Sequence, residues 1–220
     1  MREAQLARRL LLYVFGLFIV SIGVALALGS GLGVSPVDSF NYVLSLVTGL
    51  SVGTCVFFMF LLYTLLQIPI LGKQFKWIQL TQVAVAFLFG YFIDFALFLV
   101  GDLRLPTYFG QALQFGIGIF TVSSGLALYM RTNLINLPPD ALVAAIATRI
   151  PNGTFHRVKI VFDCLMALLT ALLSLLFLHG LYGVREGTVF AAIFLGKWIP
   201  LARRLWVAPL EKCGIINWEE

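Results

Sequence analysis

The chain has 220 residues, of which 60% are hydrophobic and only 11% are charged, and its mean hydropathy is +0.98. A soluble domain carries roughly 25% charged residues, so the composition excludes a soluble enzyme and indicates an integral membrane protein. The net charge of +5 bears first on membrane topology, because basic residues gather on the cytoplasmic side, and we predict no nucleic-acid partner.

Apolar runs long enough to cross a bilayer recur along the whole sequence. A helix of about 20 residues crosses a hydrocarbon core of about 30 Å. We therefore expect an all-α membrane protein with six transmembrane helices, near residues 10–29, 52–71, 77–100, 108–130, 156–178 and 186–207, and two short helices at 36–48 and 138–149. The first run resembles a secretory signal by its position, but it exceeds the ~7 to 15 residues of a signal h-region and is expected to remain as an anchor.

The stretch GLGVSPVDSF, which follows the first span, has the residues of a helix start. Ser35 suits the N-cap, Pro36 the first helical position and Asp38 the third, where a carboxylate reaches back to free amides. Capping explains these residue types, and solute or proton binding by Asp38 is the alternative. Gly31 and Gly33 permit close approach of the backbone to a neighbour or a ligand, or they form a simple turn.

The helix that follows is too short to cross the membrane and has one polar face. Thirteen residues form a helix of about 20 Å, so the segment re-enters from one side or lies in the interface. Asp38, Asn41, Ser45 and Thr48 follow one another at steps of three, four and three, which places them in one stripe. A polar stripe at membrane depth must face protein, water or a solute, so we expect it to belong to a substrate site.

The second half of the sequence repeats the first. Pro36 and Asp38 recur 102 positions later as Pro138 and Asp140, and the glycine of AVAFLFGYFI in the third span recurs 106 positions later in FAAIFLGKWI. The two copies are residues 1–106 and 107–220. Each copy has three crossings and a short broken or re-entrant helix after its first span, and because three is odd, the copies are expected to be inverted repeats, a construction found in many transporters.

Basic residues predict the orientation of these repeats. With six crossings and both termini in the cytoplasm, the cytoplasmic surface holds Arg2, Arg8, Arg9, Lys73, Lys76, Arg131, Arg149, Arg157, Lys159, Arg203, Arg204 and Lys212. Only Arg104 and Arg185 remain outside, as the positive-inside rule requires. If the short segments crossed fully, the repeats would be parallel and Lys73 and Lys76 would lie outside, which the same count disfavours.

The two motifs are not identical, and they give opposing indications about the solute. Asp140 is kept in the second motif, but Leu137 replaces the capping serine and the matching stripe is apolar. Two opposed helix starts near the midplane favour an anionic or zwitterionic solute. The carboxylates of Asp38 and Asp140 oppose that preference and leave a cation or a proton-coupled neutral solute open.

Other polar residues within the spans are further candidates for the site. Asp94 lies deep in the third span, where it is either functional or a hydrogen-bonded carboxylic acid. Lys197 in the sixth span either snorkels toward the cytoplasmic face or holds an anionic substrate. Asp163 follows Lys159 by four residues, so an intrahelical ion pair explains both without a function.

The sequence contains no enzymatic constellation. The histidines and cysteines lack metal-type spacing: His156, His179, Cys55, Cys164 and Cys213. We therefore expect no catalytic residue, no metal and no cofactor. Gln79 and Gln82, at the start of the third span, are either interfacial amides or part of an aqueous path.

The motif and its surroundings resemble a known family. The stretch GLGVSPVDSFNYVLSLVTGLSVGT, with GVREGTVFAAIFLGKWI near the end, is similar to the YczE-like membrane proteins, which are related to the YitT group. The family's second motif usually reads Gly-x-Gly-Pro-Arg-Asp-Gly, whereas this chain has Pro139 for the arginine and lacks the glycines. The resemblance implies a multi-pass protein of the bacterial cytoplasmic (inner) membrane, of undefined activity.

Three functions are compatible with these features. The first is a small secondary transporter or exporter of a small polar solute, with its site between the repeats near the starts of the short helices. The second is a membrane-embedded binding or accessory subunit that requires a partner, and the third is a channel. The expected partners are the lipid bilayer, a small-molecule solute and either a second copy of the chain or an accessory protein.

Overall fold

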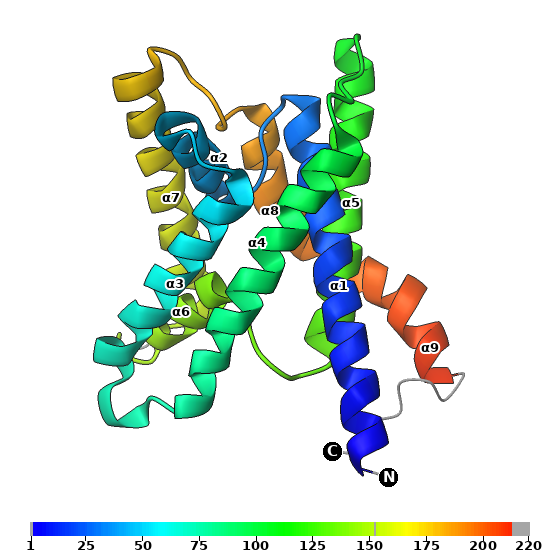
Figure 1. Cartoon of the computed structure of the whole chain (residues 1–220), viewed down its shortest axis with the longest axis vertical. Coiled ribbons are helices and arrows are strands. Elements are labelled where there is room, and N and C mark those ends of the chain that lie inside the picture. The colour runs from blue at the N-terminus through cyan, green and yellow to red at the C-terminus, as the bar shows by residue number, and fades with distance from the viewer. Residues whose placement is uncertain (1, 152, 213–220) are drawn as a thin grey trace.

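The computed structural model describes residues 2–151 and 153–212, and within these residues the chain forms helices and no strand (Figure 1). Cys213 lies outside the described residues. The main helices are α1 (Arg2–Ser30), α2 (Pro36–Thr48), α3 (Val52–Leu71), α4 (Thr81–Val100), α5 (Tyr108–Arg131), α6 (Pro138–Ala147), α7 (Phe155–Leu178) and α8 (Glu186–Ala202). Short helical turns are η1 (Gly72–Gln74), η2 (Trp77–Leu80), η3 (Arg203–Val207) and α9 (Ala208–Lys212).

Five helices of the described chain are long and apolar enough to cross a membrane: α1, α3, α4 with η2, α5 and α7. They correspond to five of the six expected spans, and α3 has the expected bounds. The sixth expected span, 186–207, contains the 17 residues of α8 and then a π-helical turn. This α-helix is about 26 Å long, somewhat less than a bilayer core. Helix α6 ends at Ala147, two residues before the expected end, because the chain turns at Thr148.

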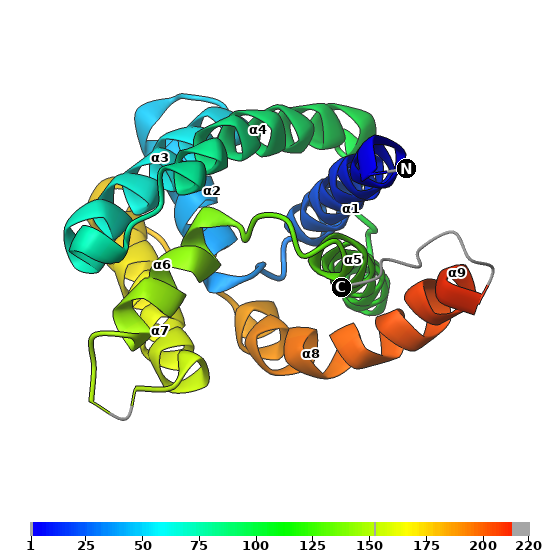
Figure 2. The same cartoon turned by 90° about the horizontal axis from the view of Figure 1, so that it is seen from below.

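Helices α1 and α5 pack extensively against each other and lie antiparallel (Figures 1 and 2). Small residues allow the two backbones to approach closely. A Cβ atom on Gly16 would meet the backbone of Tyr129 at 2.8 Å, and one on Gly118 would meet the backbone of Ala27 at 2.8 Å. The contact therefore requires glycine on both helices.

Of the remaining helices, α4 and α8 flank this pair, and α2, α3, α6 and α7 form a group beside it (Figure 2). Helix α4 lies against α1 and α8 lies against α5, while α2 packs on α7 and α6 packs on α3 (Figure 2). Helices α3 and α4 also pack directly on each other, at Gly53 and Gly90. We call the end of the bundle at which α1 begins the lower face and the opposite end the upper face (Figure 1).

Candidate functional site

The first motif forms the helix start that its residues predict. The backbone of Ser35 is extended, and its hydroxyl accepts a hydrogen bond from the Asp38 amide at 3.3 Å. The same hydroxyl donates to Asp38 Oδ2 at 2.6 Å. Pro36 occupies the first helical position, where no amide hydrogen is needed. Ser35 and Asp38 therefore form a reciprocal cap, and Asp38 keeps further capacity to accept hydrogen bonds.

The structure brings the two motif aspartates into one cluster with two residues of α7. Lys159 Nζ lies 3.2 Å from Asp140 Oδ1 and 3.2 Å from Asp163 Oδ1. Asp38 lies in the first turn of α2, which packs on α7, and is close enough to all three groups for their charges to act on it. We call these four residues the charged cluster. The predicted intrahelical pair of Lys159 and Asp163 is thus present, but it forms part of a site that joins α2, α6 and α7.

The charged cluster lies within the protein rather than at the end of the bundle. Asp163 is about 12 Å along α7, a helix of about 36 Å. The ring of Phe162 lies 5.9 Å from Lys159 Nζ, and the buried Tyr63 ring lies 5.7 Å from the Phe162 ring. The side chains of the three ion-paired residues are 20% to 34% exposed, so the protein does not enclose them completely.

Within the charged cluster, the ion pairs are unevenly distributed. Lys159 bridges Asp140 and Asp163, and among the described residues no ion pair reaches Asp38. Three carboxylates therefore share one ammonium group, so the cluster has a net negative charge when all four groups are ionised. Among the described residues, no group of three or more His, Cys, Asp or Glu side chains is arranged to hold a metal ion.

Asn41 is the second unusual group on α2. Its side chain is fully buried, and neither its amide nitrogen nor its amide oxygen has a hydrogen-bond partner in the described structure. Ser45 and Thr48 instead donate to carbonyl groups of their own helix, those of Tyr42 and Leu44. The predicted polar stripe thus reduces to Asp38 and Asn41, which lie one turn apart on the same face and retain unused capacity for hydrogen bonds.

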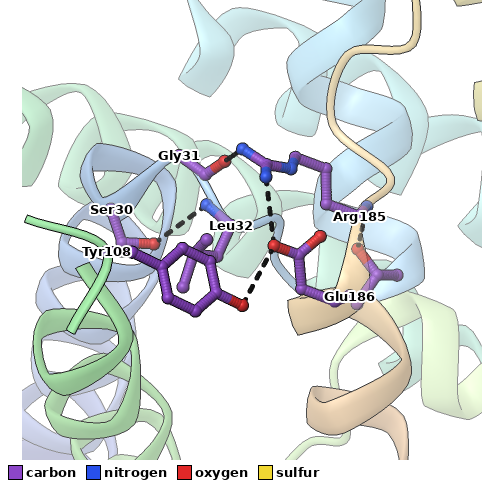
Figure 3. Close-up of polar contacts among 7 residues, drawn as sticks. Ser30, Gly31, Leu32, Tyr108, Arg185 and Glu186 are labelled. Atoms are coloured by element: carbon purple, nitrogen blue, oxygen red, sulfur yellow. Dashed lines mark hydrogen bonds and ion pairs between the residues drawn. The ribbon is translucent and has the colours of Figure 1, made fainter.

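Gly31 and Gly33 belong to a contact with residues 183–188 rather than to the charged cluster, and Figure 3 shows Gly31 beside Arg185. The Gly31 carbonyl accepts a hydrogen bond from Arg185 Nη1 at 2.9 Å, and the Leu32 carbonyl accepts one from the Gly187 amide at 2.9 Å. A Cβ atom on Gly33 would collide with the Thr188 hydroxyl, and both glycines have positive φ angles. We call this arrangement of residues 31–33 against 185–188 the upper contact. Of the two roles that the sequence leaves open for these glycines, the structure shows close approach to a neighbouring segment.

Asp94 and Lys197 make their contacts outside the charged cluster. Asp94 Oδ1 accepts a hydrogen bond from the Gly53 amide at 2.7 Å, and Oδ2 accepts one from the Ser51 hydroxyl at 2.6 Å. Asp94 thereby caps the start of α3 from the neighbouring helix. Lys197 is exposed on α8 and lies 5.6 Å from the ring of Phe194. Among the described residues, no hydrogen bond or ion pair joins either side chain to Asp38.

We expect Asp94→Ala to lower stability and to leave the properties of the charged cluster unchanged. Loss of the cap leaves the Gly53 amide without its partner, which costs about 2 kcal/mol and lowers the apparent melting temperature by about 4 to 8 °C in a chain of this size. Differential scanning fluorimetry in detergent measures the change. Asp94→Asn keeps one acceptor and should lose less, and equal losses for the two variants would contradict the capping role.

Sequence reasoning did not assign Lys159 and Asp163 to the site. The i, i+4 spacing explained both charges locally, and only the packing of α6 on α7 shows that Asp140 shares Lys159. One signal was available in the sequence. Asp163 lies inside an apolar span that ends at Leu178, where a carboxylate is costly unless it is paired or functional.

Comparisons with known proteins agree with the resemblance found in the sequence. The chain is 31% identical over 135 residues to "Uncharacterized protein YyaS" of Bacillus subtilis (strain 168), which covers 61% of this chain and 66% of that protein. It is 30% identical over 148 residues to "Uncharacterized membrane protein YczE" of the same organism, which covers 67% of this chain and 66% of that protein. The matched part therefore spans just under two thirds of each relative's length.

The comparison with solved structures gives no match. Residues 7–204 match the description "Family of unknown function (DUF6198)", which covers most of the chain. Together with the two relatives, this match confirms the similarity to YczE-like membrane proteins that the first motif and its surroundings predict. The chain belongs to the DUF6198 family of YczE-like membrane proteins.

Proposed function

We propose that the protein is a small secondary transporter that binds a small polar solute at the charged cluster, between two inverted repeats. One observation carries the proposal: Asp38 and Asp140, which occupy corresponding positions 102 residues apart, lie in the first turns of two short helices that both pack on α7. Transporters with inverted repeats bind their substrates where discontinuous helices of the two repeats meet.

The contact between α1 and α5 supports the inverted repeat. At the offset of 102, Gly16 corresponds to Gly118 and Gly23 corresponds to Gly125. Gly16 packs against Gly125, and Gly23 packs against Gly118. Such a reciprocal exchange of partners is what a two-fold axis between α1 and α5 would produce.

Local geometry also recurs at equivalent positions. The Ser30 hydroxyl donates to the Ala27 carbonyl at 2.6 Å, and 102 residues later the Thr132 hydroxyl donates to the Tyr129 carbonyl at 2.6 Å. Gly31 has a φ angle of 73°, and its equivalent Asn133 has 49°, which is uncommon for a residue with a side chain. The turn after the first helix of each half is therefore built in the same way.

Equivalent aromatic contacts join α4 to α1 and α8 to α5. Phe18 of α1 meets Phe92 of α4 edge to face at 5.4 Å, and Phe120 of α5 meets Trp198 of α8 edge to face at 6.1 Å. These are corresponding residues at offsets of 102 and 106. The match supports α8 as the counterpart of α4, and hence as the sixth crossing. With the charge count of the loops, it supports a lower face in the cytoplasm of a bacterial cell.

The charge of the site favours a solute with a cationic group. The positive ends of α2 and α6 are already opposed by Asp38 and Asp140, so the anionic solute suggested by the helix dipoles has less support. Asp38 lacks an ion-pair partner in the described structure, and Asn41 offers both a donor and an acceptor one turn away. An ammonium group with a neighbouring hydroxyl or carbonyl group would satisfy both residues.

The proposal is tested by binding and flux measurements on the purified chain. Ethanolamine, glycine and glycolate at matched ionic strength serve as cationic, zwitterionic and anionic probes. A ligand that binds only the folded state raises the apparent melting temperature, and we expect ethanolamine to raise it most. Uptake of the stabilising probe into proteoliposomes should then exceed uptake into empty liposomes. Binding without uptake would favour the accessory-subunit alternative, and near-diffusional uptake without counter-transport would favour a channel.

A further inference from the structure

The upper contact joins two segments whose repeat equivalents lie at the lower face. Residues 31–33 correspond to residues 133–135 at the offset of 102, and residues 185–188 correspond to residues 79–82 at the offset of 106. In the upper contact, the first segment is hydrogen-bonded to the second through Leu32 and Gly187, whose equivalents are Leu134 and Thr81. A symmetric molecule would join those two residues in the same way.

At the lower face, the equivalent segments line a cavity of about 310 Å³ instead. Ile78, Gln79 and Gln82 form one wall, and Leu134, Ile135 and Asn136 form the opposite wall. The cavity floor consists of small residues of α6 and includes Ala141, which follows Asp140 of the charged cluster directly. The two predicted glutamines therefore line a cavity that extends to Ala141, in the first turn of α6.

Residues 31–33 of the upper contact are more buried than their equivalents at the lower cavity. Leu32 is 3% exposed, whereas its equivalent Leu134 is partly exposed. The Arg185 guanidinium donates a hydrogen bond to the Gly31 carbonyl. At the lower face the equivalent of Arg185 is Gln79, and its amide oxygen accepts a hydrogen bond from the Lys76 amide instead. The lower segment therefore lacks the charge-assisted hydrogen bond that holds the upper one.

We infer that the upper contact and the lower cavity are the closed and open forms of one gate that the two repeats share. The inference rests on the proposed function, because it describes how a solute reaches the charged cluster. The structure is then the state that is open at the lower face. The opposite state is obtained by exchanging the conformations of the two repeats: Thr81 closes against Leu134, and Leu32 separates from Gly187.

The test measures the accessibility of residue 32 in a chain whose three native cysteines have been replaced. A single Leu32→Cys variant in detergent should react slowly with a maleimide, because residue 32 is buried in the closed upper contact. Arg185 is exposed, and Arg185→Ala removes one charge-assisted hydrogen bond from that contact. When Arg185→Ala is added to Leu32→Cys, we expect the labelling rate to rise about tenfold.

A second substitution distinguishes a shared gate from local loosening. Leu134→Trp adds a bulky side chain to the lower cavity and should hinder its closure, so it should return the labelling at position 32 in the Arg185→Ala background to the slow rate. Phe87→Trp, at a position that is 67% exposed on α4, is the matched control and should have no such effect. Fast labelling that persists with Leu134→Trp would overturn the inference, as would an unchanged rate in Arg185→Ala. The labelling assay needs no solute and is therefore independent of the flux assay. If labelling follows the expected pattern but no flux is measured, the gate is supported and the proposed transporter function is rejected.

Discussion

Gly53→Ala is expected to lower the apparent melting temperature of the detergent-purified protein by roughly 10 °C. A Cβ atom at Gly53 would overlap the carbonyl oxygen of Gly90 and would lie 2.6 Å from the carboxylate carbon of Asp94. The Gly90 carbonyl belongs to the backbone of α4 and cannot rotate away, so α3 and α4 would have to separate. Such overpacking costs about 3 kcal/mol, and each kcal/mol lowers the melting temperature by about 2 to 4 °C in a chain of this length.

The proposed repeat supplies a matched control for this variant. Gly196 occupies the position in α8 that Gly90 occupies in α4, but nothing lies within 4 Å of a Cβ atom built on it. Gly196→Ala should therefore keep the melting temperature or raise it slightly, since alanine favours a helix over glycine by about 1 kcal/mol. Differential scanning fluorimetry of both variants decides the matter, and equal losses would show that close packing at Gly53 is not the cause.

Asp38→Asn is expected to reduce transport of the cationic probe at least tenfold while the melting temperature changes by only a few degrees. The asparagine oxygen still accepts the hydrogen bond from Ser35, so the start of α2 is preserved. The substitution removes the negative charge that would hold the solute, and at ~4 Å two unit charges interact by about 4 kcal/mol near a protein surface. Initial uptake rates in proteoliposomes, normalised to folded protein, measure the effect.

Ser35→Ala separates binding from helix capping. It removes the cap but keeps the carboxylate of Asp38, so it should cost about 1 kcal/mol of stability and retain most of the transport. If Asp38→Asn transports at the wild-type rate and only the melting temperatures change, the sole role of Asp38 is to cap α2. Asp38→Asn should therefore reduce the uptake rate more than the melting temperature, whereas Ser35→Ala should reduce the melting temperature more than the uptake rate.

The helical elements could be predicted because each depends on its own residues. The apolar run of α3 and the Ser35, Pro36 and Asp38 signal of α2 both gave the observed bounds. The end of α8 could not be placed in this way, because helical conformation continues through the π-helical turn Arg203–Val207, whose two arginines are followed by three apolar residues. A change of helix type inside an apolar segment depends on packing.

The site could be predicted only in part, for the same reason. Sequence reasoning identified both motif aspartates because each repeats a local helix-start signal. It could not establish that Lys159 bridges Asp140 and Asp163, since that contact depends on the packing of α6 against α7. It also placed Asp94 among the candidates, whereas the residue caps α3 across the hairpin. A polar residue inside a span indicates a need for a partner without showing which partner it has.

The antiparallel packing of α1 on α5 has a consequence for the order of assembly during synthesis. The partners of Gly16 and Gly23 lie about 100 residues later in the chain, whereas α3 and α4 are sequence neighbours and can pair as soon as both are inserted. Domains form as their parts emerge, and contacts of large sequence separation form late. The glycine face of α1 must therefore remain without its native partner until α5 has been made. A chain that ends before α5 would expose this face to lipid or to other helices in the membrane.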